Sequence, residues 1–149
     1  MAKYNKILLA LDFHGDNSKI LERGADMAEA NSAELFLIHV NEPLAIAYAA
    51  DGMSWSDQVV ALEASLRKEA QAKMGEIAGK LNVKADNCII KEGKPSTEIH
   101  KAVDDHGIDL IVLGTHGQSG LQLILGSTAN SVLHGVTCDV LAVRVNGDD

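Results

Sequence analysis

The sequence predicts an α/β protein built on a doubly wound, five-stranded parallel sheet. Five short apolar runs recur along the chain, at residues 6–11, 34–40, 87–92, 109–113 and 139–143. These runs are continuous rather than alternating, which is typical of parallel strands buried on both faces. The segments between them repeat apolar residues at helical spacing, so the order is β-α-β-α-β-α-β-α-β. Right-handed crossovers then place helices on both faces of the sheet.

Length and charge limit the possible classes. The 149 residues carry 13 Lys+Arg and 21 Asp+Glu, a net charge of −8. We expect one domain spanning residues 1–149. An acidic chain without a Lys/Arg run is not expected to bind nucleic acid, and no apolar stretch approaches the roughly 18 residues of a membrane span. There is no signal-peptide pattern, and two cysteines build no disulfide framework, so we expect a cytoplasmic protein.

The first strand, residues 6–11, ends at Asp12 and Gly15 and leads into a helix that runs to about Ala30. Three residues offer N-caps for this helix: Asp16, Asn17 and Ser18. The second strand follows at 34–40. Residues 41–57 are the least regular part and are interpreted as a loop.

A long helix is expected from Gln58. Its apolar face consists of Val59, Leu62, Leu66, Ala70, Met74, Ile77 and Leu81. The preceding segment at Met53–Trp55 admits three interpretations: a lid over a site, a partner surface, or packing against this helix. Sequence alone does not separate them.

The second half of the chain repeats the strand–helix pattern. Pro95 opens a helix after the third strand, and Gly107 ends it as a C-cap glycine. The fourth strand, 109–113, leads into a glycine-rich loop at 114–126 and a helix at 127–134. The fifth strand is followed by an acidic tail.

The glycine-rich loop is the strongest local signal for function. In an open α/β sheet, ligands bind beyond the carboxyl ends of the strands, where the strand order reverses. Closely spaced glycines let the backbone approach a ligand, and successive N–H groups can form an anion-binding concavity. Gly126 and Ser127 then open a helix with unsatisfied N–H groups, and hydroxyls are added by Ser119, Ser127 and Thr128.

These features predict a phosphate cradle. The alternative is that the glycines only shape a loop and cap a helix. Neither of the standard mononucleotide and dinucleotide motifs, G-x-x-x-x-G-K-[ST] and G-x-G-x-x-G, is present.

Asp12, at the end of the first strand, also has two interpretations. It could accept bonds from ribose hydroxyls or hold Mg²⁺ on a nucleotide, or it could simply start a turn. Among the six histidines, His14 and His116 could converge at this edge, and His116 is a candidate phosphate contact. No Cys/His spacing typical of a metal site occurs, so a structural metal is not expected. Cys88 and Cys138 are interpreted as buried small hydrophobic residues.

The chain resembles the universal stress protein family, of the single-domain bacterial type. The resemblance runs from the first strand and Asp12, through residues 37–40, to its most specific part at 109–143. It implies a Rossmann-like sandwich, similar to the adenine nucleotide alpha hydrolases, with strand order 3-2-1-4-5. It further implies a cytoplasmic homodimer that acts in survival under stress.

Members of this family that bind ATP share a pattern of Gly, two residues, Gly, nine residues, then Gly-Ser or Gly-Thr. Gly114 and Gly117 match its start and Gly126-Ser127 its end, but eight residues separate Gly117 from Gly126. By resemblance Asp12 would hold ribose or a magnesium ion on the phosphates. Adenine would be lined by Ala10, Val40 and Leu113, and ribose and phosphates would be contacted by Gly114, Gly117, Gly126, Ser127 and Thr128.

Three hypotheses follow. The first is a regulatory module that binds ATP or another adenine nucleotide with Mg²⁺. The second is a nucleotide-free dimeric interaction protein, paired through the apolar edge strand Val140, Leu141, Ala142 and Val143. The third is an enzyme, but no nucleophile–base pair, paired carboxylates or catalytic lysine can be identified, so at most slow ATP hydrolysis is expected.

Overall fold

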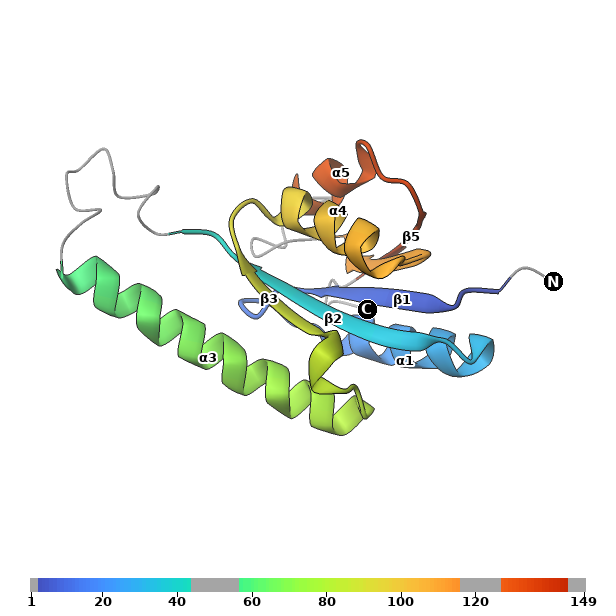
Figure 1. The fold of residues 1–149 in the computed structure, drawn as a ribbon, viewed down its shortest axis with the longest axis horizontal. Coiled ribbons are helices and arrows are strands. Elements are labelled where there is room, and N and C mark those ends of the chain that lie inside the picture. Colours follow the sequence, from blue (N-terminus) through green and yellow to red (C-terminus); the bar gives the residue numbers. More distant parts are fainter. Residues whose placement is uncertain (1–2, 44–56, 116–126, 145–149) are drawn as a thin grey trace.

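A computed structural model describes residues 3–43, 57–115 and 127–144 of the protein. Within these ranges the chain forms one parallel sheet with strand order β3-β2-β1-β4-β5, which confirms the expected fold and order (Figure 1). The strands are β1 (Lys6–Leu11), β2 (Glu34–Asn41), β3 (Cys88–Glu92), β4 (Leu110–Gly114) and β5 (Asp139–Val143). The helices are α1 (Ser18–Asn31), α3 (Asp57–Leu81), the 3₁₀ turn η2 (Ala85–Asn87), α4 (Pro95–His106) and α5 (Ser127–Leu133).

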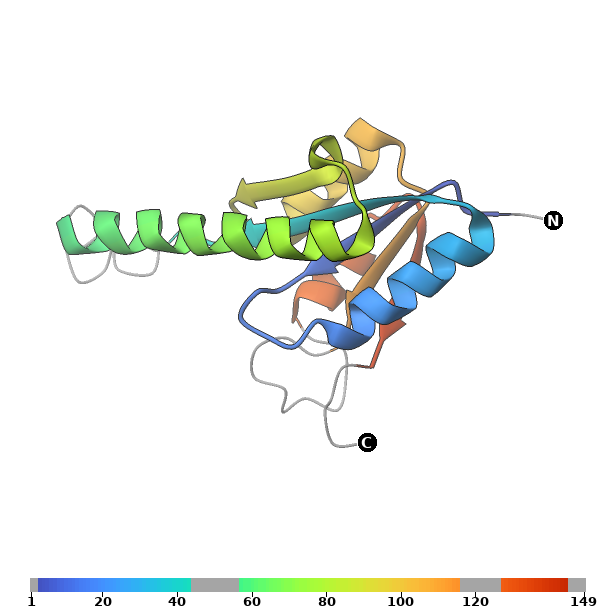
Figure 2. The same cartoon turned by 90° about the horizontal axis from the view of Figure 1, so that it is seen from below.

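The sheet is covered by helices on both faces. Figures 1 and 2 show α1 and α3 on one face and α4 and α5 on the other. The central strand β1 is enclosed on both faces, and Ile7, Leu8 and Leu9 have no exposed surface. Ile7 and Leu9 face the α1 and α3 layer, whereas Leu8 faces the α4 and α5 layer. This burial on both faces explains why the strands read as continuous apolar runs.

Helix α3 begins at Asp57, one residue before the expected start, and only its C-terminal part covers the sheet. Ala70 and Met74 are buried, but Leu62, expected on the apolar face, is 46% exposed. A helix of 25 residues is about 38 Å long, whereas the 8 residues of β2 span about 26 Å. The helix therefore extends past the carboxyl ends of β2 and β3 (Figure 2).

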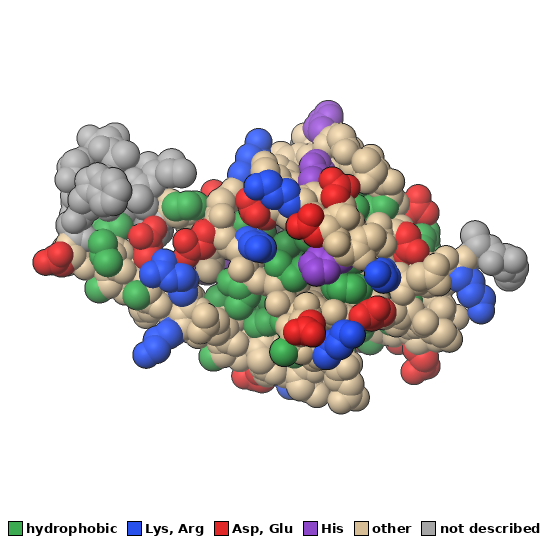
Figure 3. Space-filling view, in the orientation of Figure 1, with side chains coloured by type: hydrophobic (Ala, Val, Ile, Leu, Met, Phe, Trp, Pro, Cys, Tyr) green, Lys and Arg blue, Asp and Glu red, His purple; other side chains and the backbone are tan. Residues whose placement is uncertain are grey.

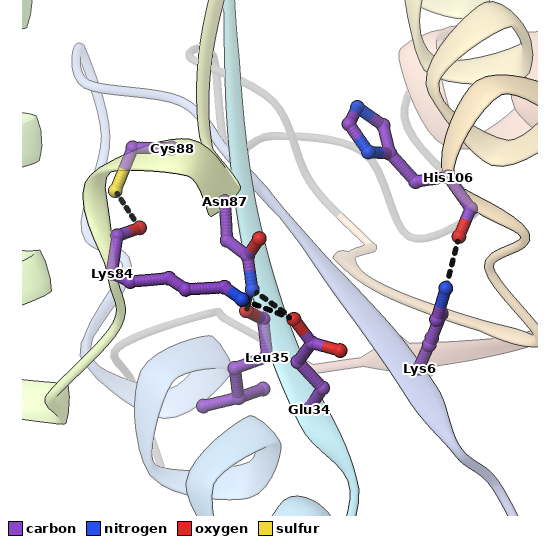
Figure 4. A network of polar contacts seen from close by, with 7 residues as sticks. All are labelled: Lys6, Glu34, Leu35, Lys84, Asn87, Cys88 and His106. Carbon is purple, nitrogen blue, oxygen red and sulfur yellow. Dashed lines mark hydrogen bonds and ion pairs between the residues drawn. The ribbon is translucent and has the colours of Figure 1, made fainter.

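Two helix-boundary signals in α4 are confirmed. Pro95 occupies the first turn, and Gly107 adopts a left-handed conformation with φ of 68° at the C-terminal cap. The turn η2 corrects the predicted start of the third strand, because Asn87 is the last residue of this turn and β3 begins at Cys88. The buried Asn87 side chain donates hydrogen bonds to the Glu34 carboxylate (2.8 Å) and the Leu35 carbonyl (3.0 Å), which joins η2 to β2 (Figure 4).

The amino ends of the strands are held together by polar contacts. The Asp109 carboxylate accepts the N–H groups of Asn5 (2.8 Å) and Lys6 (3.1 Å), and the Lys6 ammonium donates to the His106 carbonyl (3.1 Å; Figure 4). These contacts tie the start of β1 to the turn before β4. They leave the opposite edge, where the strands end, for binding.

The surface over β3 carries charges of both signs around hydrophobic side chains, without a single-signed patch on that face (Figure 3). Of the helices within the described ranges, none has the length and apolar character needed to cross a membrane.

Candidate functional site

The order of the strands reverses between β1 and β4. The chain leaves β1 toward α1 on one face of the sheet, and it leaves β4 toward α5 on the other. The two connections diverge, and a crevice of this kind at the carboxyl ends of parallel strands is where open α/β sheets bind ligands. The candidate site therefore lies beyond Leu11 of β1 and Gly114 of β4.

Three apolar residues expected at the site share one face of this edge. Ala10, Val40 and Leu113 stand near the carboxyl ends of β1, β2 and β4. Leu113 is buried, and the half-buried Ala10 and Val40 pack against the same hydrophobic cluster. Because β2, β1 and β4 are neighbours, these residues form an apolar row across three strands, on the face covered by α4 and α5.

Part of the expected site falls outside the described ranges. Residues 116–126 include His116, Gly117, Ser119 and Gly126, and the Met53–Trp55 segment is also outside. Gly114 is the last residue of β4, and the following Thr115 N–H donates to the Val143 carbonyl at 2.9 Å. Ser127 begins α5, and Thr128 is exposed in its first turn.

Asp12 holds a tight turn at the end of β1. Its Oδ1 accepts the His14 N–H at 3.0 Å, and its carbonyl accepts the Gly15 N–H at 2.9 Å. The turn interpretation of Asp12 is therefore observed. The half-buried carboxylate lies at the switch point, so the ligand interpretation is compatible with the same placement.

Asn17 contributes to this turn in a way that the sequence did not predict. It stands at the N-cap position of α1 but makes no capping bond with its side chain. Instead, its Oδ1 accepts the Asp12 N–H at 3.0 Å, and its Nδ2 donates to the Asp12 carbonyl at 2.8 Å. The amide side chain thus mimics a backbone partner for Asp12 and fixes where its carboxylate stands. An Asx residue six positions after the end of β1, and five after Asp12, is the signal in the sequence that could have indicated this role.

The loop rests on a buried aromatic pair. The Phe13 ring stacks on the His39 ring with centroids 4.2 Å apart and an interplanar angle of 19°. Both residues are buried, and the Lys73 ammonium of α3 donates to the Phe13 carbonyl at 2.9 Å. His39 was expected inside the second strand, but its contact with the loop was not.

Asp16 is a second carboxylate in the loop after β1. The exposed Asp16 carboxylate accepts hydrogen bonds from the backbone N–H and from the side chain of Ser18. These bonds hold the pKa of the Asp16 carboxyl below its ordinary value. Within the ranges that the structure describes, no group of three or more His, Cys, Asp or Glu side chains could hold a metal ion by itself.

Comparison with known proteins gives a consistent result. The model of the universal stress protein family matches residues 3–144. The chain is 41% identical to universal stress protein A homolog 2 of Coxiella burnetii over 148 residues, which is 99% of each chain. It is 31% identical to the universal stress protein YxiE of Bacillus subtilis, covering 95% of this chain and 99% of that one.

Solved structures agree with the fold. The structure of MJ0577 from Methanocaldococcus jannaschii superposes with a TM-score of 0.78 and 29% identity, covering 99% of this chain and all of that one. A universal stress protein solved in complex with cAMP has the same fold, with a TM-score of 0.59, 22% identity and coverage of 96% and 98%.

Proposed function

This chain belongs to the universal stress protein family, and from that premise we propose that it is a stress-response module that binds ATP or a related adenine nucleotide. The observation that carries the proposal is the row of Ala10, Val40 and Leu113 beside the switch point between β1 and β4. An apolar row next to polar loop groups suits a flat base joined to a polar sugar and phosphates.

Each part of the nucleotide has a proposed partner. The adenine would lie against Ala10, Val40 and Leu113. The Asp12 carboxylate would accept from ribose or hold Mg²⁺ on the phosphates, as oxygen ligands suit that ion. The phosphates would be contacted by the remaining loop and helix residues, which are Gly114, Gly117, Gly126, Ser127 and Thr128, with His116 and Ser119 as further candidates.

The charge of the protein bears on how phosphates would be bound. A net charge of −8 repels a polyanion at long range, so local groups must overcome that repulsion. Backbone N–H groups of a glycine-rich loop do this without adding cations. The class of ligand is supported by the relative of the same fold that was solved in complex with cAMP.

Calorimetric titration with ATP, ADP and AMP, with and without Mg²⁺, tests the proposal. Asp12→Asn is the sharpest variant, because an asparagine Oδ1 can still accept the His14 N–H while the charge is lost. We expect it to bind MgATP about tenfold more weakly, equivalent to about 1.4 kcal/mol. Asp16→Asn, an exposed neighbour in the same loop, serves as the matched control and should bind as the wild type does. Absence of heat at millimolar nucleotide in the wild type would refute nucleotide binding.

We propose a binding module rather than an efficient enzyme. No nucleophile–base pair was identified in the sequence, and a magnesium ion held by Asp12 would support slow hydrolysis at most. Multiple turnovers of ATP that disappear in Asp12→Ala would instead make the protein an ATPase.

We also propose that the chain forms a homodimer through β5. This strand lies at the end of the sheet, and no strand among the described residues pairs with its outer side. The Thr115 N–H bonds to the Val143 carbonyl, so the backbone groups of Val143 and Leu141 face β4. Those of Val140 and Ala142 therefore face outward, because the direction alternates along a strand. Pairing with a second copy of β5 would satisfy them.

This alternation gives a clean test of the dimer. Ala142→Pro removes an outward N–H and leaves the bonds to β4 in place, so it should yield a folded monomer in sedimentation. Leu141→Pro removes an inward N–H and should destabilise the fold itself. A wild type that sediments as a monomer at micromolar concentration would refute the dimer.

A nucleotide-free dimer is the second candidate function. It predicts dimeric wild type with no heat in the nucleotide titration, so the two experiments together separate the candidates. In either case we propose a cytoplasmic protein, because Cys88 and Cys138 are both free thiols, which a reducing compartment preserves.

A further inference from the structure

His39 connects the ends of two strands through both of its ring nitrogens. The side chain is 3% exposed. Its Nδ1 lies 3.1 Å from the Leu11 carbonyl oxygen at the end of β1, and its Nε2 lies 2.9 Å from the Asn41 side-chain oxygen at the end of β2. The ring therefore bridges β1 and β2 directly beneath the turn that carries Asp12.

The contact with Leu11 determines where the proton sits. A carbonyl oxygen only accepts, so Nδ1 must donate to it, since two acceptors 3.1 Å apart would repel. The Phe13 N–H also points at Nδ1, but from 3.5 Å, at the limit of hydrogen bonding. The shorter contact favours a proton on Nδ1.

Nε2 then has two possible states. If it is protonated too, the ring is a buried cation, and no carboxylate contacts either ring nitrogen among the described residues. If it is unprotonated, it needs a donor. Asn41 supplies one, because its Nδ2 is buried and has no hydrogen-bond partner among the described residues.

Turning the Asn41 amide by half a turn resolves both problems. Nδ2 then donates to Nε2, and a neutral ring donates through Nδ1 to Leu11. Both ring nitrogens and the Asn41 Nδ2 are then paired without burying a charge, and the Asn41 Oδ1 takes the position that Nδ2 held.

We propose that His39, neutral and protonated on Nδ1, is a positioning residue that locks the carboxyl ends of β1 and β2 together and holds the Asp12–Phe13 turn at the nucleotide site. The effect on affinity rests on the proposed nucleotide binding; the effect on the turn does not.

The stack on Phe13 shows how the lock reaches the site. With rings 4.2 Å apart and nearly parallel, a shift of His39 must displace Phe13, which is 8% exposed and has little free space. Phe13 directly follows Asp12, so the carboxylate moves with it. Movement of the imidazole would thus change the distance between Asp12 and the apolar row.

Two variants separate this role from simple packing. His39→Asn places an amide group near the position of Nδ1 and can still donate to the Leu11 carbonyl, but its side chain is too short to contact Asn41. His39→Gln places its amide near the position of Nε2 and loses the bond to Leu11. Both lose the aromatic stack, so the difference between them compares the Leu11 bond, which only His39→Asn keeps, with the Asn41 bond, which only His39→Gln keeps.

Three measurements complete the test. Nitrogen-15 spectra of the imidazole in the nucleotide-free wild type should show a protonated Nδ1 and an unprotonated Nε2. Amide hydrogen exchange of the nucleotide-free proteins at residues 13–15 should be faster in His39→Gln than in His39→Asn. MgATP affinity should fall about tenfold in His39→Gln and less than threefold in His39→Asn.

Each outcome has a defined meaning. A proton on Nε2 alone, or equal exchange in the two variants, overturns the positioning role. If the wild type binds no nucleotide but His39→Gln still loses protection of the turn, the proposed function fails and the positioning role stands. If both variants lose protection but bind MgATP as the wild type does, the lock has no effect on the site and the proposal is wrong.

Discussion

The Lys73 ammonium of α3 donates a hydrogen bond to the main-chain oxygen of Phe13, a residue 60 positions earlier, at a distance of 2.9 Å. This bond links the long helix to the turn after β1. Through it, a solvent-facing helix takes part in fixing the turn on which Asp12 stands.

Lys73→Met should loosen this turn with little loss of global stability. The bond joins an exposed side chain to a backbone oxygen, so we expect about 0.5–1.5 kcal/mol of destabilisation. Hydrogen exchange at residues 13–15 should accelerate by more than global unfolding accounts for. Lys80→Met, which removes an exposed ammonium 4.0 Å from Glu76 on the same helix, is the control. If both variants exchange alike at 13–15, the bond does not order the turn.

Gly24→Ala should destabilise the protein even though alanine favours helices. A Cβ at Gly24 would stand 2.7 Å from Cδ1 of Leu9, and Leu9 has no exposed surface and no room to move. Overpacking of this kind costs about 1–3 kcal/mol. Gly79→Ala in α3 is the matched control, because nothing lies within 4 Å of its would-be Cβ. Urea unfolding should show that Gly79→Ala gains about 0.8–1.0 kcal/mol from helix propensity; a gain in Gly24→Ala would contradict the packing.

Glu34 should make stability depend on acidic pH. The hydrogen bond from Asn87 holds the pKa of the Glu34 carboxyl below its ordinary value, with further help from Lys84. A lowered pKa in the folded state stabilises the protein above the unfolded value, and that contribution is lost as pH falls through the folded value. The stability gap between wild type and Glu34→Gln should therefore be largest at neutral pH and close below about pH 4.3.

Asn87→Ala should remove the same pH-dependent contribution and add a second cost. It leaves the Leu35 carbonyl without its side-chain donor, for which we expect about 1–3 kcal/mol. Urea unfolding of wild type and both variants at neutral and acidic pH separates the two effects. If the difference in unfolding free energy between the wild type and Asn87→Ala does not change with pH, the Asn87–Glu34 bond does not favour the ionised carboxylate.

Both cysteines should react slowly with alkylating reagents. Burial raises the pKa of the Cys88 thiol, and burial together with the nearby Asp139 and Asp109 carboxylates raises that of Cys138. Because the thiolate is the reactive form, iodoacetamide should modify the native protein more slowly than the urea-unfolded chain. Asp139→Asn should increase the rate at which Cys138 is alkylated and leave the alkylation rate of Cys88 unchanged. An equal effect on both thiols would exclude a local charge as the cause.

The strands could be predicted because burial on both faces of a parallel sheet requires short, continuous apolar runs. Their order followed from the resemblance to the universal stress protein family. Both ends of α4 could also be predicted. Proline suits the first turn of a helix, as Pro95 does, and glycine suits the left-handed C-terminal cap, as Gly107 does. The overhang of α3 could not be predicted, because helical periodicity continues past the point where the sheet stops supporting it. Asn17 and His39 were missed for another reason. Their roles depend on partners brought close by the fold, Asp12 for one and Leu11 for the other.

The parallel pairing of β1 with β4 has a consequence for how the chain is made. β1 emerges from the ribosome before β4, and about a hundred residues separate these two partners, as the bond between the Lys6 N–H and Asp109, 103 positions apart, illustrates. Until then β1 can pair with β2 alone, and its other edge stays open to wrong partners. Contacts so distant along the chain slow folding. The nascent protein therefore passes through an interval in which the central strand β1 is paired along one edge only, and a chaperone that shields strand edges would act in that interval.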